Sequence, residues 1–198
     1  MSSRSAEEIR HAVRKRYAEV SCSAAGRFSY PTGKAGAIAV GYDLSLLVDL
    51  PDDVFDTFCG VGNPFALGAI QGGEKVLDVG CGAGFDLILA SRLVGPVGRA
   101  CGVDFTPEMV KKAQANLVRA RANNASATVG IAEAIPYDDD AFDVVISNGV
   151  LNLSPLKERS LREIFRVLKP NGRLQFADIV LNEDVRAEMT DSLDAWSD

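Results

Sequence analysis

Glycines at alternate positions, with carboxylates close by, are the residues of this sequence whose spacing most clearly permits ligand chemistry. The apolar segment 75–79 leads directly into the run GCGAG at positions 80–84, and Asp104 ends the next apolar segment. Such glycines let the backbone turn sharply and approach a ligand closely. The free N–H groups of a helix that follows suit a nucleotide or the carboxylate of an amino acid. A carboxylate at position 104 can accept both hydroxyls of a ribose.

Asp78 separates two kinds of ligand for this turn. Dinucleotide-binding enzymes use the spacing GxGxxG, with a pyrophosphate at the helix start, whereas the spacing here is GxGxG. A buried acid beside the ligand repels a pyrophosphate, but it suits a ligand with an ammonium group and a sulfonium charge. S-adenosylmethionine is such a ligand. The segment 76–104 therefore favours S-adenosylmethionine as the cofactor, and a dehydrogenase is the weakest of the alternatives.

The elements that must position this turn are indicated by hydrophobic periodicity. Helical spacing predicts helices over 6–20, 85–94, 107–121 and 157–168, and short β-type apolar runs predict strands over 75–79, 99–103, 127–131, 142–147 and 173–180. Residues 21–42 are expected to form a loop, and residues 43–70 short helices and turns. Thr106 is expected as an N-cap, with Pro107 at the first helical position. Strands alternating with helices predict an α/β fold with a doubly wound, mostly parallel sheet of about five strands.

Charge and composition disfavour several kinds of partner. The chain has 198 residues and a formal net charge of −6, which disfavours nucleic acid. No apolar run reaches the roughly 20 residues that a membrane helix needs, so no membrane partner is expected. The first residues are charged and lack an apolar signal region, which indicates a cytoplasmic protein. The four cysteines form no CxxC pair and His11 is the single histidine, so no metal site is expected.

The segments after the turn resemble class I S-adenosylmethionine-dependent methyltransferases over about residues 73–180. YDDDAFDVV at 137–145 resembles the turn into the fourth strand, which ends at SNGV, 147–150, under the expected methyl-donor position; RVLKPNGRL at 166–174 resembles the last helix and turn. The resemblance implies a Rossmann-like fold with S-adenosylmethionine as cofactor. The residues expected to bind that cofactor are Asp78, Gly80, Cys81, Gly82, Gly84, Asp104, Phe105, Met109, Ala132, Glu133, Asn148 and Gly149.

A narrower resemblance, to arsenite methyltransferases, extends over roughly residues 6–198. It is carried by VLDVGCGAGFDLILASRLVGPVGRACGVDFTPEM, GVGNP and VVISNGVLNLSPLKE, and by the loop VSCS that follows the first predicted helix. In that family soft thiolates hold trivalent arsenic, and thiolate is the ligand type that suits a soft centre. The family usually has cysteines where this chain has Val61 and Gly149. The candidate acceptor-side thiols are therefore Cys22 and Cys59.

The end of the sequence suggests that part of the family's fold is missing. The family's sheet has seven strands and we expect only about five, so the last two are predicted to be absent or supplied by another chain. The bare edge of the fifth strand then favours a homo-oligomer. From Leu181 onward six carboxylates accompany one arginine. We interpret residues 1–72 as an extension covering the cofactor site, 73–182 as the S-adenosylmethionine-binding methyltransferase core, and 183–198 as an acidic segment that begins a truncated region.

Three functions fit these residues. The leading hypothesis is a methyltransferase acting on a small-molecule acceptor and resembling arsenite methyltransferases. The first alternative keeps the fold and transfers the methyl group to carbon or oxygen of a quinone-like or other small metabolite. The second is a non-catalytic, S-adenosylmethionine-binding truncated homologue. No strong general base is evident, and Tyr17, on the first predicted helix, is interpreted as facing the core.

Overall fold

The computed structural model describes residues 5–180, which form a parallel β-sheet flanked by helices. Its strands are β1 (Lys75–Val79), β2 (Arg99–Asp104), β3 (Ala125–Val129), β4 (Phe142–Asn148) and β5 (Leu168–Ala177). Its α-helices are α1 (Ala6–Val20), α2 (Gly33–Ala39), α3 (Phe85–Val94), α4 (Pro107–Arg119) and α5 (Lys157–Val167), joined by the 3-10 segments η1 (Leu44–Leu47), η2 (Asp52–Val54), η3 (Pro64–Leu67) and η4 (Leu151–Leu153). The strand order β3-β2-β1-β4-β5, with every neighbouring pair parallel, confirms the predicted α/β sheet.

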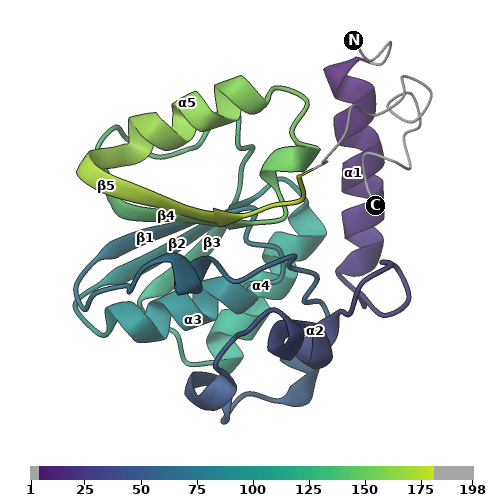
Figure 1. The fold of residues 1–198 in the computed structure, drawn as a ribbon, viewed down its shortest axis with the longest axis horizontal. Coiled ribbons are helices and arrows are strands. Elements are labelled where there is room, and N and C mark those ends of the chain that lie inside the picture. The colour runs from purple at the N-terminus through teal and green to yellow at the C-terminus, as the bar shows by residue number, and fades with distance from the viewer. Residues whose placement is uncertain (1–4, 181–198) are drawn as a thin grey trace.

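Helices cover both faces of this sheet. α3 and α4 lie on one face and α5 on the other (Figure 1). Leu87 of α3 and Ala113 of α4 belong to one buried cluster, and Ile164 of α5 belongs to a second. Because both faces are covered, the central strand β1 is buried at every position after Lys75.

Helix α1 stands beside the end of the sheet toward which β5 points (Figure 1). It begins with a capping box, in which the Ser5 hydroxyl accepts the Glu8 N–H and the Glu8 carboxylate accepts the Ser5 N–H. Ile9, Val13 and Val20 bury its inner face. The carboxyl ends of parallel strands are where open α/β sheets bind ligands, so α1 borders the place where a site is expected.

Several predicted boundaries were wrong. The segment 21–42, expected to be a loop, contains α2, whose composition of Gly, Ala and Lys gives little apolar periodicity. Strand β3 spans Ala125–Val129 rather than 127–131, and α4 ends at Arg119 rather than at 121. Strand β5 spans Leu168–Ala177 rather than 173–180, because it begins before the Pro-Asn-Gly segment and passes through it with an irregularity. Asn171 has a φ of 65° within this irregularity, as in a β-bulge.

The predicted acidic segment 183–198 lies outside the described residues. Within residues 5–180, no helix combines the length and hydrophobicity that crossing a membrane requires.

Candidate functional site

A cavity that is partly open to solvent lies at the carboxyl ends of the strands. Its wall is formed by the turn after β1, the end of β2, the loop after β3, the end of β4 and one face of α1. Three of the strands concerned are neighbours in the sheet order, and β4 adjoins β1. The cavity therefore occupies the edge of the sheet where ligands bind in open α/β folds.

The glycine turn after β1 depends on backbone conformations that favour glycine. Gly80, Gly82 and Gly84 have φ values of 76°, 49° and 88°. A Cβ added to Gly80 would lie 2.3 Å from a methyl carbon of Val150, and one on Gly84 would lie 3.2 Å from Ala113. A Cβ added to Gly82 would meet no atom within 4 Å, and Gly82 lines the cavity. The turn is thus packed on the protein side and open on the cavity side.

Asp104, the last residue of β2, ties this turn to the start of α4. One carboxylate oxygen accepts the Gly82 N–H at 2.9 Å, and the other accepts the Thr106 N–H at 2.8 Å. Burial raises the pKa of Asp104, although the two backbone hydrogen bonds oppose that shift. Thr106 is the N-cap as predicted, but its side chain makes no capping hydrogen bond. The Asp104 carboxylate lines the cavity, where its remaining lone pairs can accept ligand hydroxyls.

Asp78 lies beneath the turn rather than on the cavity wall. Its side chain is only 2% exposed, and its Oδ2 has no hydrogen-bond partner among the described residues. Burial raises the pKa of Asp78 well above its ordinary value, and the neighbouring carboxylates of Asp86 and Asp104 raise it further. Burying a carboxylate without a partner costs free energy, and a nearby cation would stabilise its ionised form.

Glu133, in the loop after β3, marks the other end of the cavity. Its Oε1 accepts the Ser154 hydroxyl at 2.9 Å and the Arg10 guanidinium at 3.2 Å. Glu133 is 5% exposed, whereas the Arg10 side chain is 32% exposed. Arg10 therefore connects α1 to the loop after β3 across the cavity wall.

One face of α1 covers the cavity. Arg10, Val13 and Tyr17 follow one another at helical spacing and all three line it. Tyr17, which the sequence pattern assigned to the core, also packs against a small cluster containing Met109 of α4. This helix consequently supplies the wall opposite the strand ends.

The candidate thiols lie in different environments. Cys59 lines the cavity, whereas Cys22 is exposed and lies outside its wall. Burial, with the carboxylates of Asp104 and Asp86 nearby, raises the pKa of the Cys59 thiol to about 12. At neutral pH Cys59 is therefore a protonated thiol, which is a poorer metalloid ligand than a thiolate.

The predicted cofactor-binding residues divide into two groups. On the cavity wall lie Gly80, Gly82, Asp104, Phe105, Met109, Ala132, Glu133, Asn148 and Gly149. Asp78, Cys81 and Gly84 do not line it, because they form the packed underside of the turn. Sequence reasoning missed Arg10, Val13, Thr57 and Ser154 on the wall. Helical spacing within α1 could have suggested Arg10 and Val13 as neighbours of Tyr17, whereas nothing local distinguishes Thr57 or Ser154.

The doubly wound sheet, the glycine turn after β1 and the carboxylate ending β2 define a Rossmann-like, class I methyltransferase fold. Residues 70–197 match the family described as "Methyltransferase domain", and the chain belongs to this family.

The relatives of this chain include arsenite methyltransferases. The chain is 39% identical over 194 residues to the arsenite methyltransferase of Halobacterium salinarum, covering 91% of this chain and 49% of that protein. It is 37% identical over 110 residues to the demethylmenaquinone methyltransferase of Listeria monocytogenes, covering 55% of this chain and 46% of the relative. The chain spans about half the length of these curated relatives.

A solved structure supports the same grouping. The arsenic(III) S-adenosylmethionine methyltransferase of Chlamydomonas reinhardtii superposes with a TM-score of 0.66 at 36% identity. The match covers 73% of this chain and 50% of the other.

Proposed function

We propose that this chain is an S-adenosylmethionine-dependent methyltransferase, similar to arsenite methyltransferases, that acts on a small-molecule acceptor. The observation that carries the proposal is the pairing of Asp104 on the cavity wall with the unpartnered Asp78 beneath the glycine turn. The orphaned Asp78 oxygen fits a ligand that brings positive charge, and the open space at Gly82 leaves room for it. A pyrophosphate would instead add negative charge beside a buried acid.

Three parts of the wall would hold this cofactor. Asp104 would accept the ribose hydroxyls, the loop carrying Glu133 would border the adenine, and the turn at Gly80 and Gly82 would receive the amino-acid moiety. When bound, S-adenosylmethionine supplies a methyl group that its sulfonium has already activated. The chain's own residues then have to orient donor and acceptor and exclude water, and such positioning can account for a large share of the rate.

Arsenite is the first acceptor to test, because an arsenite methyltransferase and an arsenic(III) methyltransferase match most of the chain. A carbon or oxygen acceptor on a quinone-like metabolite is the second candidate. Two observations favour it. The thiol on the cavity wall, Cys59, is protonated at neutral pH. Val61 and Gly149, which lie against one another, stand where arsenite methyltransferases usually have cysteines, so these two positions supply no thiolate.

Calorimetry with S-adenosylmethionine, S-adenosylhomocysteine and NAD tests the cofactor. We expect both adenosyl ligands to bind and NAD not to bind, and binding of NAD alone would overturn the proposal. Methyl transfer from S-adenosylmethionine to arsenite, with thiols present, and to a naphthoquinol then separates the two acceptors. Turnover of neither compound by a protein that binds the adenosyl ligands would leave the non-catalytic alternative as the better account.

Replacing Asp104 by alanine is expected to weaken S-adenosylhomocysteine binding by roughly 1–3 kcal/mol, because ribose hydroxyls would lose their acceptor. Asp104→Asn keeps one side-chain oxygen and should lose less. Glu108→Ala, on the exposed side of the first turn of α4, is the matched control and should bind normally. Calorimetric affinities check this, and an unchanged affinity in Asp104→Ala would show that Asp104 does not hold the ribose.

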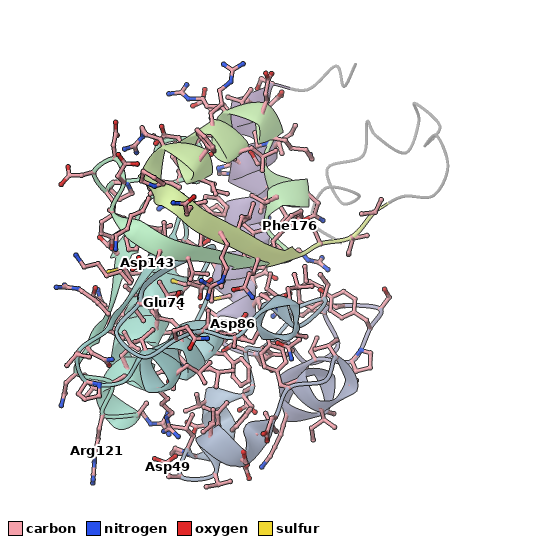
Figure 2. The ribbon with its side chains drawn as sticks, turned by 60° about the vertical axis from the view of Figure 1, so that its left-hand side comes forward. Asp49, Glu74, Asp86, Arg121, Asp143 and Phe176 are labelled. Atoms are coloured by element: carbon pink, nitrogen blue, oxygen red, sulfur yellow. The ribbon has the colours of Figure 1, made fainter. Side chains whose placement is uncertain are left out.

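We further propose the division into a covering extension (1–72), a methyltransferase core (73–182) and an acidic segment (183–198). The cavity contacts of Arg10 and Tyr17 support the covering role of the extension. A cytoplasmic location is supported by the four free cysteines. Self-association through the β5 edge is supported by the exposed Phe176 on that strand (Figure 2).

A further inference from the structure

Asn148, the last residue of β4, is bonded to a turn distant in the sequence. Its Oδ1 accepts the N–H groups of Val61 and Gly62 at 2.9 and 3.2 Å, and its Nδ2 donates to the Gly62 carbonyl at 2.9 Å. A Cβ on Gly60 would lie 2.3 Å from that Nδ2, so the backbone approaches the amide as closely as only glycine permits. Residues 60–62, called here the 60–62 turn, are thus bonded to both the oxygen and the nitrogen of the Asn148 amide.

The Asn148 amide is itself held in place by Tyr42 and, through Tyr42, by Asp86. The Tyr42 hydroxyl donates to Asp86 Oδ1 at 2.6 Å and accepts from Asn148 Nδ2 at 3.0 Å. Asp86 is 8% exposed and lies inside the molecule, in the first turn of α3 (Figure 2). The amide nitrogen has only two hydrogens, and the Gly62 carbonyl and Tyr42 hydroxyl take them at shorter range than its 3.3 Å approach to Asp86 Oδ2. Hydrogen bonds therefore run from Asp86 through Tyr42 and Asn148 to the turn.

The aromatic ring of Tyr42 is fixed independently of its hydroxyl. It packs edge-on against Phe58, Phe65 and Phe85, with centroid distances of 5.5, 6.1 and 5.2 Å. Such contacts remain when only the hydroxyl is removed. The ring and the hydrogen bond can consequently be tested separately.

The 60–62 turn borders the cavity on its β4 side. Cys59, immediately before the turn, and Gly149 both line the cavity, and a Cβ on Gly149 would lie 3.4 Å from Val61. The sheet order places the loop after β3 and the end of β4 on opposite sides of β1 and β2. With the ribose at β2 and the adenine toward β3, the reactive methyl group and its acceptor fall at the β4 side.

We propose that Asp86 and Tyr42 are positioning residues that hold the 60–62 turn through Asn148 and so shape the acceptor end of the cavity. The assignment of that end rests on the proposed function, whereas the mechanical coupling does not. The donor side is held by a different set of bonds, from Gly82 and Thr106 to Asp104. Loss of the Tyr42 hydroxyl should therefore loosen the acceptor end and leave the donor end in place.

The charge state of Asp86 supplies an independent readout. Burial raises the pKa of Asp86 to about 6, although the hydrogen bond from the Tyr42 hydroxyl and the nearby Asn148 amide oppose the shift. The titratable groups facing it are Tyr42, Asp78 and Cys59. The ionised carboxylate is the better acceptor for the Tyr42 hydroxyl. The coupling should consequently be stronger above about pH 6 than below it.

Amide hydrogen exchange on the full chain, read residue by residue and corrected for intrinsic rates, tests the coupling. In Tyr42→Phe we expect protection of the Val61 and Gly62 amides to fall about 10-fold, the equivalent of one hydrogen bond. Protection of the Gly82 and Thr106 amides should stay within about 2-fold. Tyr137→Phe, which removes a hydroxyl that contacts Cys101 of β2, is the matched control and should change neither pair.

Asp86→Asn provides the second variant, because an amide at position 86 keeps an acceptor for Tyr42 but does not titrate. Wild-type protection of the 60–62 turn should rise between pH 5 and 7 by about 3-fold or more, and this rise should be absent in Asp86→Asn. Unchanged protection in Tyr42→Phe, or equal losses at both pairs of amides, would overturn the proposal. Calorimetry with S-adenosylhomocysteine keeps the two hypotheses distinct: failure to bind refutes the proposed function, while the exchange data still decide the coupling.

Discussion

Replacing Gly80 by alanine is expected to destabilise the protein by about 2–4 kcal/mol, through two additive causes. The φ of 76° at Gly80 strains any residue that has a Cβ, and that strain costs roughly 1–2 kcal/mol. The new Cβ would also lie 2.3, 2.6 and 2.9 Å from side-chain carbons of Val150, which lies between the end of β4 and the start of η4. Urea unfolding, with the slope compared between variants, measures the sum.

Val150→Ala separates the two causes. In a Gly80→Ala, Val150→Ala double variant the clash is relieved while the backbone strain remains, so about half of the lost stability should return, after correction for Val150→Ala alone. Gly82→Ala is the matched control on the same turn. Its φ of 49° lies in the left-handed region and its Cβ would meet no atom within 4 Å, so it should cost only about 1 kcal/mol.

Gly82→Ala is also expected to affect ligand binding, and to do so more strongly than it affects stability. Because Gly82 lines the cavity, a methyl group there occupies ligand space, and Gly82→Ala should weaken S-adenosylhomocysteine binding more than it weakens folding. Two results would contradict this account: Gly82→Ala destabilising the fold more than Gly80→Ala, or Val150→Ala failing to restore any stability to Gly80→Ala.

The parts of the fold that sequence predicted well are those fixed by local signals. The turn at Gly80 follows a buried strand and precedes a helix, and each of these elements is identified by residues within a few positions. The position of Asp104 at the end of the following strand predicts a place at the site, and the structure puts it on the cavity wall. Its contact with a ribose stays a prediction. The parallel sheet followed from the alternation of elements, since short crossovers leave few arrangements of the strands.

Contacts between distant segments account for what sequence did not predict. Arg10 reaches Glu133 across 123 positions of the chain, and Asn148 reaches Val61 across 87. No local pattern encodes such pairs, so the bonds of the Asn148 amide to the 60–62 turn were not predicted. Asn148 also lines the cavity, and its contact with the cofactor stays a prediction. The helix α2 was missed for a related reason, because Gly33–Ala39 is stabilised by its packing rather than by its own periodicity.

Asp78→Asn is expected to change stability and ligand affinity in opposite directions. In the folded protein burial keeps the Asp78 pKa well above its ordinary value, so the native state retains a proton that the unfolded chain has lost. The contribution of Asp78 to the free energy of unfolding is thus fully present below the pKa of the unfolded chain. It falls as the pH rises toward the pKa in the folded protein, by up to about 1.4 kcal/mol per pH unit. An amide at position 78 does not titrate, so the free energy of unfolding of Asp78→Asn does not fall in this way. The variant should be at least as stable as the wild type at pH 7.

Asp143→Asn is the control of opposite sign. Burial raises the pKa of Asp143, but the Lys169 ammonium at 2.7 Å and the Lys75 N–H at 2.8 Å outweigh it, and the net pKa is lowered. A lowered folded pKa contributes stability above the unfolded pKa that is lost on acidification. Asp143→Asn should therefore be less stable than the wild type at pH 7, as measured by thermal unfolding at several pH values.

Ligand binding is expected to change the protonation of Asp78. A ligand carrying an ammonium group favours the ionised carboxylate, so wild-type binding of S-adenosylmethionine below the raised pKa should release up to one proton. Calorimetry in two buffers of different ionisation enthalpy measures that proton. In Asp78→Asn the release should vanish and affinity should fall about 10-fold or more, because the cation loses its charged partner. Equal affinity and equal proton release in the two proteins would show that Asp78 does not respond to the ligand. In the unfolding experiment, a less stable Asp78→Asn at pH 7 would mean that the ionised carboxylate has a stabilising partner inside the fold.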